Sequence, residues 1–172
     1  MIETLLPGLL ALQNVHPLFV HFPIAFFLGA FAMEVLAILR HEKYHIVATG
    51  LLYLGALSAV AAATTGLIAE YQVAAVSGGH HTPSHGAIHI HKAWMVSATV
   101  VGVFLSIYLF WINKTGRWLS QRFVFLLGLM LLSAIVVLGA DRGARLVFEF
   151  GTGVNPEILK SITEQDNPSP GH

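Results

Sequence analysis

The sequence predicts an all-α integral membrane protein whose four helices form an up-down-up-down bundle. Charged residues make up only 10% of the 172 residues, less than half of the roughly 25% that is usual in soluble domains. The mean hydropathy is +0.71, which is far too high for a soluble globular chain of this size. Four separate stretches are each long and apolar enough to cross a bilayer, and together they leave room for a single bundle.

Each predicted span supplies about 20 mostly apolar residues, enough for a helix to cross a hydrocarbon core of about 30 Å. A helix is expected because backbone groups inside a bilayer must pair within their own segment. The spans are expected at about 17–39, 46–70, 90–112 and 122–140. They belong to one transmembrane domain over residues 1–154, which is followed by a periplasmic tail over 155–172.

Lysine and arginine indicate the orientation of the bundle, because basic residues in short loops remain in the cytoplasm. The basic residues between the first and second spans and between the third and fourth spans are Arg40, Lys43, Lys114, Arg117 and Arg122. We therefore expect both termini and the 71–89 loop to be periplasmic, in a bacterial inner membrane. Residues 2–14 lack the basic region and the A-x-A site of a cleavable signal, and they predict an interfacial segment.

Composition also excludes several classes of function. A net charge of zero argues against a nucleic-acid partner, which requires a basic surface. The absence of cysteine excludes disulfides, thiolate zinc sites, cysteine-ligated iron–sulfur clusters and covalently attached haem. Hydrolysis is not expected, because neither an H-E-x-x-H helix nor a nucleophile–base–acid set is present. The ten histidines are therefore the best available ligands for a redox metal.

Two histidines are the leading candidates for axial ligands of haem b. His21 lies about one turn inside the first span, and His91 begins the third, so both should lie at similar depth near the periplasmic face. Two imidazoles on neighbouring helices can occupy both axial positions of a haem iron. Small residues share their helix faces, as a porphyrin slot requires, although such residues also favour plain helix packing. The alternative for each is an interfacial histidine bonded to a backbone carbonyl or a lipid headgroup.

Other histidines are secondary candidates for the same cofactor. His16 is rotated by roughly 140° from His21 on a helix, so it would serve a second haem or a propionate. His85 and His89 form an i, i+4 pair that suits a shared metal ion as well as it suits chance. For the exposed histidines of residues 80–85, a polar loop is the simpler interpretation.

Charged residues give weaker signals. Arg142 and Arg145 follow the fourth span against the positive-inside trend, which suggests haem propionates as an anionic partner. An ion pair between Asp141 and Arg145 is the alternative.

Two acidic residues also lie in or beside the spans. Within the first span, Glu34 is expected to pair with Arg40 near the cytoplasmic face. Glu70 could be a ligand, a proton acceptor or an interfacial acid, and the last of these is favoured.

Residues 16–26, H-P-L-F-V-H-F-P-I-A-F, resemble the H-P-x-x-V-H-F-P-I-A signature of a bacterial membrane family, the domain of unknown function 2231. Residues 65–68 and 145–154 resemble further family stretches more loosely. The resemblance implies a four-helix membrane protein, and fusions of some members to Rieske-type or cytochrome-like domains imply electron transfer and b-type haem. His16, His21 and His91 match histidines of the family. The chain departs from the family near its C-terminus, where many members carry histidines.

The function expected from these observations is a b-type haem-binding membrane subunit with one haem b, or two, and no catalytic residues of its own. It would pass electrons between a periplasmic cytochrome or other redox subunit and quinone or a partner subunit. One alternative is a cofactor-free membrane anchor of a redox complex. Another is a histidine-rich carrier or sensor of divalent metals, since imidazole suits zinc, copper and nickel. Small-residue faces could also pack against a second copy in an oligomer.

Overall fold

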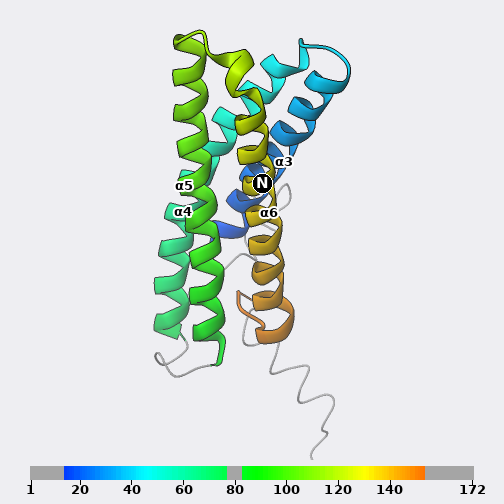
Figure 1. Cartoon of the computed structure of the whole chain (residues 1–172). Helices are drawn as coiled ribbons and strands as arrows, with labels where there is room; N and C mark the ends of the chain where they lie inside the picture. The colour runs from blue at the N-terminus through cyan, green and yellow to red at the C-terminus, as the bar shows by residue number, and fades with distance from the viewer. Residues whose placement is uncertain (1–13, 77–82, 154–172) are drawn as a thin grey trace, which may run out of the picture.

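Four long helices make up the computed structural model, which describes residues 14–76 and 83–153. They follow the chain as α3 (His16–Leu39), α4 (Tyr44–Val76), α5 (Pro83–Lys114) and α6 (Trp118–Phe150), and no strand occurs within the described ranges (Figure 1). This confirms the predicted all-α, four-helix fold. The expected interfacial segment, the C-terminal tail and three histidines lie outside the described residues; these histidines are His80, His81 and His172.

All four helices are long and apolar enough to cross a membrane, so the chain is a multi-pass membrane protein. With a rise of about 1.5 Å per residue, α3 is about 36 Å long and each of the others is about 50 Å long. The helices extend beyond the stretches expected from hydropathy: α5 begins at Pro83 rather than near 90, and α6 continues to Phe150 rather than ending near 140. Helical hydrogen bonding continues into polar sequence, whereas a hydropathy window stops where polar residues begin.

Local sequence accounts for where these helices start and stop. Pro17 lies in the first turn of α3, where its missing N–H costs no intrahelical hydrogen bond. α6 ends at Gly151, which adopts a left-handed conformation with φ of 62°. Its N–H bonds back to carbonyls of the last turn, an ending that glycine makes at the lowest steric cost.

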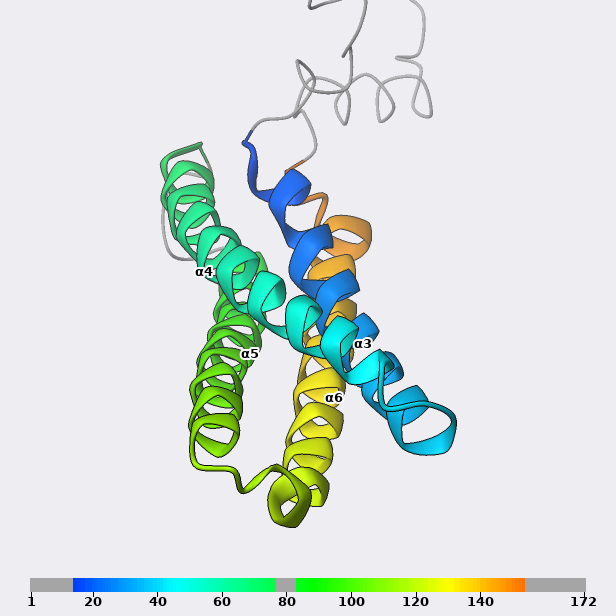
Figure 2. The same cartoon turned by 90° about the horizontal axis from the view of Figure 1, so that it is seen from above.

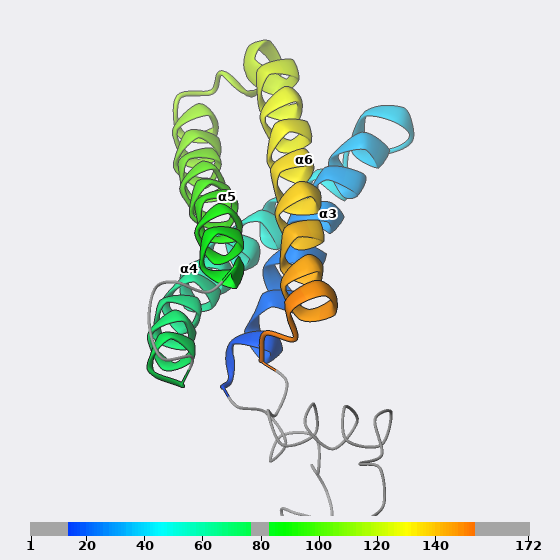
Figure 3. The same ribbon diagram turned by 90° about the horizontal axis from the view of Figure 1, so that it is seen from below.

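The bundle is built from two helical hairpins that cross each other. α3 packs along α4 and α5 packs along α6, while further contacts join α4 to α5 and α3 to α6. Because the hairpins cross, the α3–α4 and α5–α6 connections lie at the same end of the bundle but diverge from each other (Figures 2 and 3). The start of α3 and the end of α6 lie side by side at the opposite end of the bundle from these connections (Figures 2 and 3).

A single phenyl ring joins the hairpins at the centre of the core. Phe27 of α3 is 1% exposed, and its ring lies against Gly55 of α4 and Gly102 of α5. A Cβ atom at Gly55 would come within 2.6 Å of the ring, and one at Gly102 would also clash with it. Glycine at both positions therefore lets Phe27 insert between the helices. Gly102 is 11 residues after His91 on the same helix face, where the sequence predicts small residues for a porphyrin slot. In the structure it lies against Phe27 and does not line the cavity described below.

Candidate functional site

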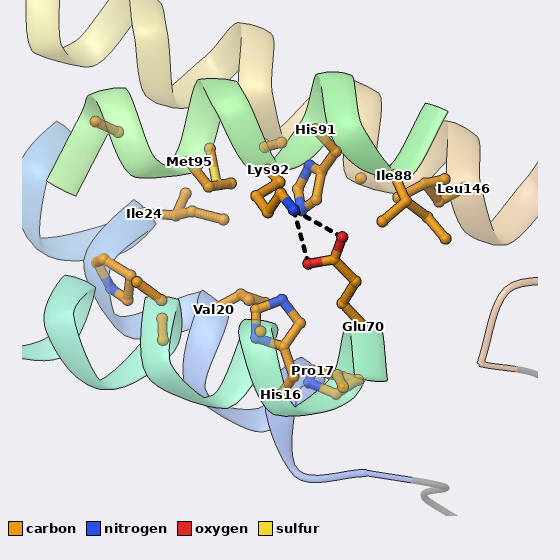
Figure 4. A pocket seen from close by; sticks show the side chains of 18 of the residues that line it. His16, Pro17, Val20, Ile24, Glu70, Ile88, His91, Lys92, Met95 and Leu146 are labelled. Atoms are coloured by element: carbon orange, nitrogen blue, oxygen red, sulfur yellow. Dashed lines mark hydrogen bonds and ion pairs between the residues drawn. The ribbon is translucent and has the colours of Figure 1, made fainter. Parts of the chain in front are cut away.

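A cavity of about 450 Å³ lies between the four helices, and its volume falls in the range of small-molecule and cofactor sites. We call the end of the bundle that contains it the histidine end, because His16 and His91 both line the cavity (Figure 4). Apolar and small residues form most of its wall. The charged side chains among the lining residues are those of Glu70 and Lys92.

His91 is held in one orientation by α6. Its Nδ1 lies 3.0 Å from the backbone carbonyl oxygen of Gly139. A carbonyl can only accept, so Nδ1 carries the hydrogen and the lone pair of the neutral ring lies on Nε2. One turn further along α6, a Cβ at Gly143 would lie 2.8 Å from Cε1 of His91, so glycine gives the ring its place. This is how proteins commonly orient a metal-binding histidine, through a hydrogen bond from its other nitrogen.

His16 is held in a similar way by α4. Its Nδ1 lies 3.3 Å from Oγ1 of Thr65, and that hydroxyl donates to the carbonyls of Ala61 and Ala62 at 3.1 and 3.0 Å. Because the hydroxyl hydrogen is directed at these carbonyls, Thr65 accepts from Nδ1 of His16, and the lone pair of the neutral ring again lies on Nε2. A Cβ at Gly66 would lie 2.9 Å from Cε1 of His16, so glycine is again required beside the ring.

The two hairpins therefore present their histidines by the same construction. In each hairpin the first helix carries the imidazole, and the second helix provides a glycine against the ring and an acceptor for Nδ1. Both rings reach one cavity, from α3 and from α5 (Figure 4). The arrangement offers two oriented nitrogen ligands to a single guest.

His21, which the sequence favoured as the partner of His91, lies elsewhere. It is exposed on α3 and is not among the residues that line the cavity. The roughly 140° between His16 and His21 means that when one faces the cavity the other faces away. The sequence contains that rotation but not the direction of the bundle interior. In the structure, His16 lines the cavity and His21 does not.

The two arginines expected near haem propionates do not line the cavity. Arg142 lies over the ring of Trp94 at 4.5 Å and donates to the carbonyl of Leu138 at 2.7 Å. Arg145 bonds to Glu149 at 2.6 Å, so the alternative pair with Asp141 is also replaced. Because α6 continues to Phe150, an acid one turn later is available to Arg145.

An ion pair that the sequence analysis did not anticipate lies in the cavity wall. Nζ of Lys92 is 2.7 and 2.9 Å from the two carboxylate oxygens of Glu70, joining α5 to α4 (Figure 4). Both side chains are partly exposed. The sequence suggests several roles for Glu70 but none for Lys92. A lysine next to His91, just inside a span, is the signal that could have identified it.

A second polar cluster lies at the opposite end of the bundle. Glu34 is completely buried, with Oε2 at 2.7 Å from Nδ1 of His45 and Oε1 at 3.1 Å from Nε of Arg122. The expected pair with Arg40 is therefore wrong, because Glu34 points into the bundle toward α6 while Arg40 follows the end of α3 and is exposed. We call Glu34, His45, Arg122 and their neighbour Glu42 the Glu34 cluster.

Glu42 closes this cluster from the α3–α4 connection. Its carboxylate accepts from Nη1 of Arg122 at 2.8 Å and from the indole N–H of Trp118 at 3.3 Å. The Trp118 hydrogen bond, and after it the Arg122 guanidinium, hold the pKa of the Glu42 carboxyl below its usual value. The cluster therefore ties the first hairpin to α6 at this end.

His85 and His89 lie near the start of α5, outside the cavity lining. Their Nε2 atoms are 3.1 Å apart. Within residues 14–76 and 83–153 no group of three or more histidine or acidic side chains is arranged to hold a metal ion.

Comparison with known proteins identifies one family. A family model described as a predicted membrane protein, DUF2231, matches residues 12–156, a stretch that includes all four helices. No curated protein and no solved structure matches the chain.

Proposed function

The chain belongs to the DUF2231 family of predicted membrane proteins, and from that premise we propose that it is a membrane electron-transfer subunit that holds haem b between His16 and His91. The observation that carries the proposal is the pair of imidazoles lining one cavity, each bonded through Nδ1 so that Nε2 bears the lone pair. Two such nitrogens match the ligand set of a six-coordinate haem b iron. A cofactor-free membrane anchor would need neither imidazole to be oriented in this way.

The residues around the cavity fit such a group in chemistry as well as in number. His16 and His91 would hold the group, and a haem b held by two histidines would supply single-electron transfer rather than oxygen chemistry. Thr65 and Gly139 orient the two rings and strengthen them as ligands. The mostly apolar wall would surround a bound haem with few polar groups, and low polarity is one of the means by which a protein tunes a haem potential.

Lys92 takes the role proposed from sequence for Arg142 and Arg145. It lines the cavity, and its ammonium group could release the Glu70 carboxylate and bind a haem propionate in its place. The basic connections near Arg40 and Arg117 favour an orientation with the Glu34 cluster on the cytoplasmic side of a bacterial inner membrane. The histidine end then faces the periplasm, where a cytochrome or another redox subunit could exchange electrons with it, and quinone or a partner subunit would complete the path.

Visible spectroscopy of purified protein tests this proposal. The full chain, produced with a haem precursor in the medium and purified in detergent, should show a sharp α-band after reduction with dithionite. His16→Ala and His91→Ala should each abolish the six-coordinate spectrum. His21→Ala is the matched control, because it removes an exposed imidazole from the same helix as His16.

The controls separate failure of the site from failure of the fold. Helix content by circular dichroism and a monodisperse elution profile should be unchanged in all three variants. Loss of the band in His21→Ala with retention in His16→Ala would restore the pairing expected from sequence. Folded wild-type protein that takes up no haem would overturn the proposed function.

A further inference from the structure

The first two turns of α5 bring two imidazole nitrogens together outside the cavity. His85 and His89 are one helical turn apart, and their Nε2 atoms lie 3.1 Å from each other. The ring centroids are 4.5 Å apart and the planes are nearly perpendicular, at 87°. Residues four apart share a helix face, so the helix itself holds the two rings in this arrangement.

This separation suits two ligands of one metal ion. Nitrogen ligands lie about 2.0–2.1 Å from zinc. For an ion at that distance from both Nε2 atoms, the N–metal–N angle would be about 100°. That angle falls between the roughly 90° of a tetragonal copper or nickel site and the roughly 109° of a tetrahedral zinc site. The two Nε2 atoms are within hydrogen-bonding distance of each other, and a bound ion would replace the hydrogen that they share. Their separation therefore allows chelation without a change of backbone.

His89 and the turn of α5 that it shares with Gly86 are accessible to ions from water. α5 is about 48 Å long, and a hydrocarbon core of about 30 Å cannot cover it from end to end. His89 is exposed, and the space around neighbouring Gly86 is open, with no atom within 4 Å of a Cβ built there. Neither histidine lines the cavity, so this feature is separate from the proposed haem site.

We propose that His85 and His89 form a surface site for one divalent first-row transition-metal ion, with water completing the coordination. Imidazole is a good ligand for copper, nickel and zinc, and for a given nitrogen site the divalent affinities rise from nickel to copper and fall again at zinc. The ion would join two successive turns near the start of α5.

Calorimetric titration of tag-free, full-length protein in detergent with CuCl₂, NiCl₂ and ZnCl₂ tests the site. We expect one ion per chain at the tightest site, with Cu²⁺ binding more tightly than Ni²⁺ or Zn²⁺. His85→Ala and His89→Ala should each weaken that binding roughly tenfold or more. His21→Ala and His41→Ala, which remove exposed histidines elsewhere, should leave it unchanged.

A variant that keeps the number of histidines tests the spacing. In His89→Ala/Ile90→His the second imidazole moves to five residues from His85, about 140° around the helix, so the affinity should fall as in His89→Ala. Unchanged affinity in this variant or in His89→Ala would overturn the proposal and point to other histidines. Absence of binding by the wild-type chain would overturn it too. The haem spectrum should be the same in all these variants, so the two proposals fail independently.

Discussion

Removing the buried carboxylate of the Glu34 cluster should strongly destabilise the bundle. Glu34 is 0% exposed and the Arg122 side chain is 14% exposed, so Glu34→Gln leaves a largely buried guanidinium without its ionic partner at Nε. Breaking a buried ion pair from one side costs about 3–5 kcal/mol. For Glu34→Gln the loss in the free energy of unfolding should lie near the lower end of this range, about 3 kcal/mol, because Nη1 of Arg122 keeps its hydrogen bond to Glu42.

The free energy of unfolding can be followed by circular dichroism as SDS is titrated into detergent micelles. Glu34→Gln and Arg122→Gln should each lower it, whereas the double variant should lose less than the sum, because no unbalanced charge remains buried. Arg40→Gln is the matched control: Arg40 is the exposed partner expected from sequence, and its loss should cost no more than about 1 kcal/mol. Equal losses in Arg40→Gln and Arg122→Gln, or strict additivity in the double variant, would refute the buried pairing.

Three further predictions follow from the same contacts. Gly143→Ala places a methyl group against the ring of His91, so the amount of haem retained, measured by absorbance, should fall. Gly50→Ala is the control: its methyl group meets open space, so haem should be retained and the free energy of unfolding should rise by up to about 1 kcal/mol. Thr65→Val removes an Nδ1 acceptor and should weaken haem binding about 10–100-fold in a haem titration. Since the pKa of Glu42 is lowered on folding, mainly by Trp118, its contribution is complete above the unfolded pKa and is lost as pH falls through the folded one. Melting temperatures should therefore fall more between pH 5 and pH 3, roughly the range of carboxyl titration, in wild type than in Glu42→Gln.

The fold was largely predictable because a membrane span is a local property of the sequence. Length and hydropathy over about 20 residues are sufficient to recognise a span, and all four expected spans lie within helices of the structure. The ends were less predictable. The hydropathy-based spans stop where the polar stretches around His85 and Arg142 begin, yet both residues lie inside regular helix.

The candidate site was predictable in composition but not in pairing. The excess of histidine and the lack of cysteine directed attention to imidazole ligands, and His91 does line a cavity. The choice between His16 and His21 depended on which side of α3 faces the other hairpin, a matter of rotation that hydropathy did not resolve in a helix apolar all round. The Glu70–Lys92 pair was missed because its members are 22 residues apart and meet only when α4 packs on α5.

The sequence by itself determined that this chain has four segments able to span a membrane, that no cysteine thiolate can bind a metal, and that His16 and His21 cannot face the same way. Each of these depends on residue type or on spacing along one helix. Tertiary structure alone decided that His16 joins His91, that Glu34 pairs with Arg122 rather than Arg40, and that Phe27 fills the space beside Gly102. Those outcomes depend on how two hairpins cross, which is set by side-chain packing summed over both of them.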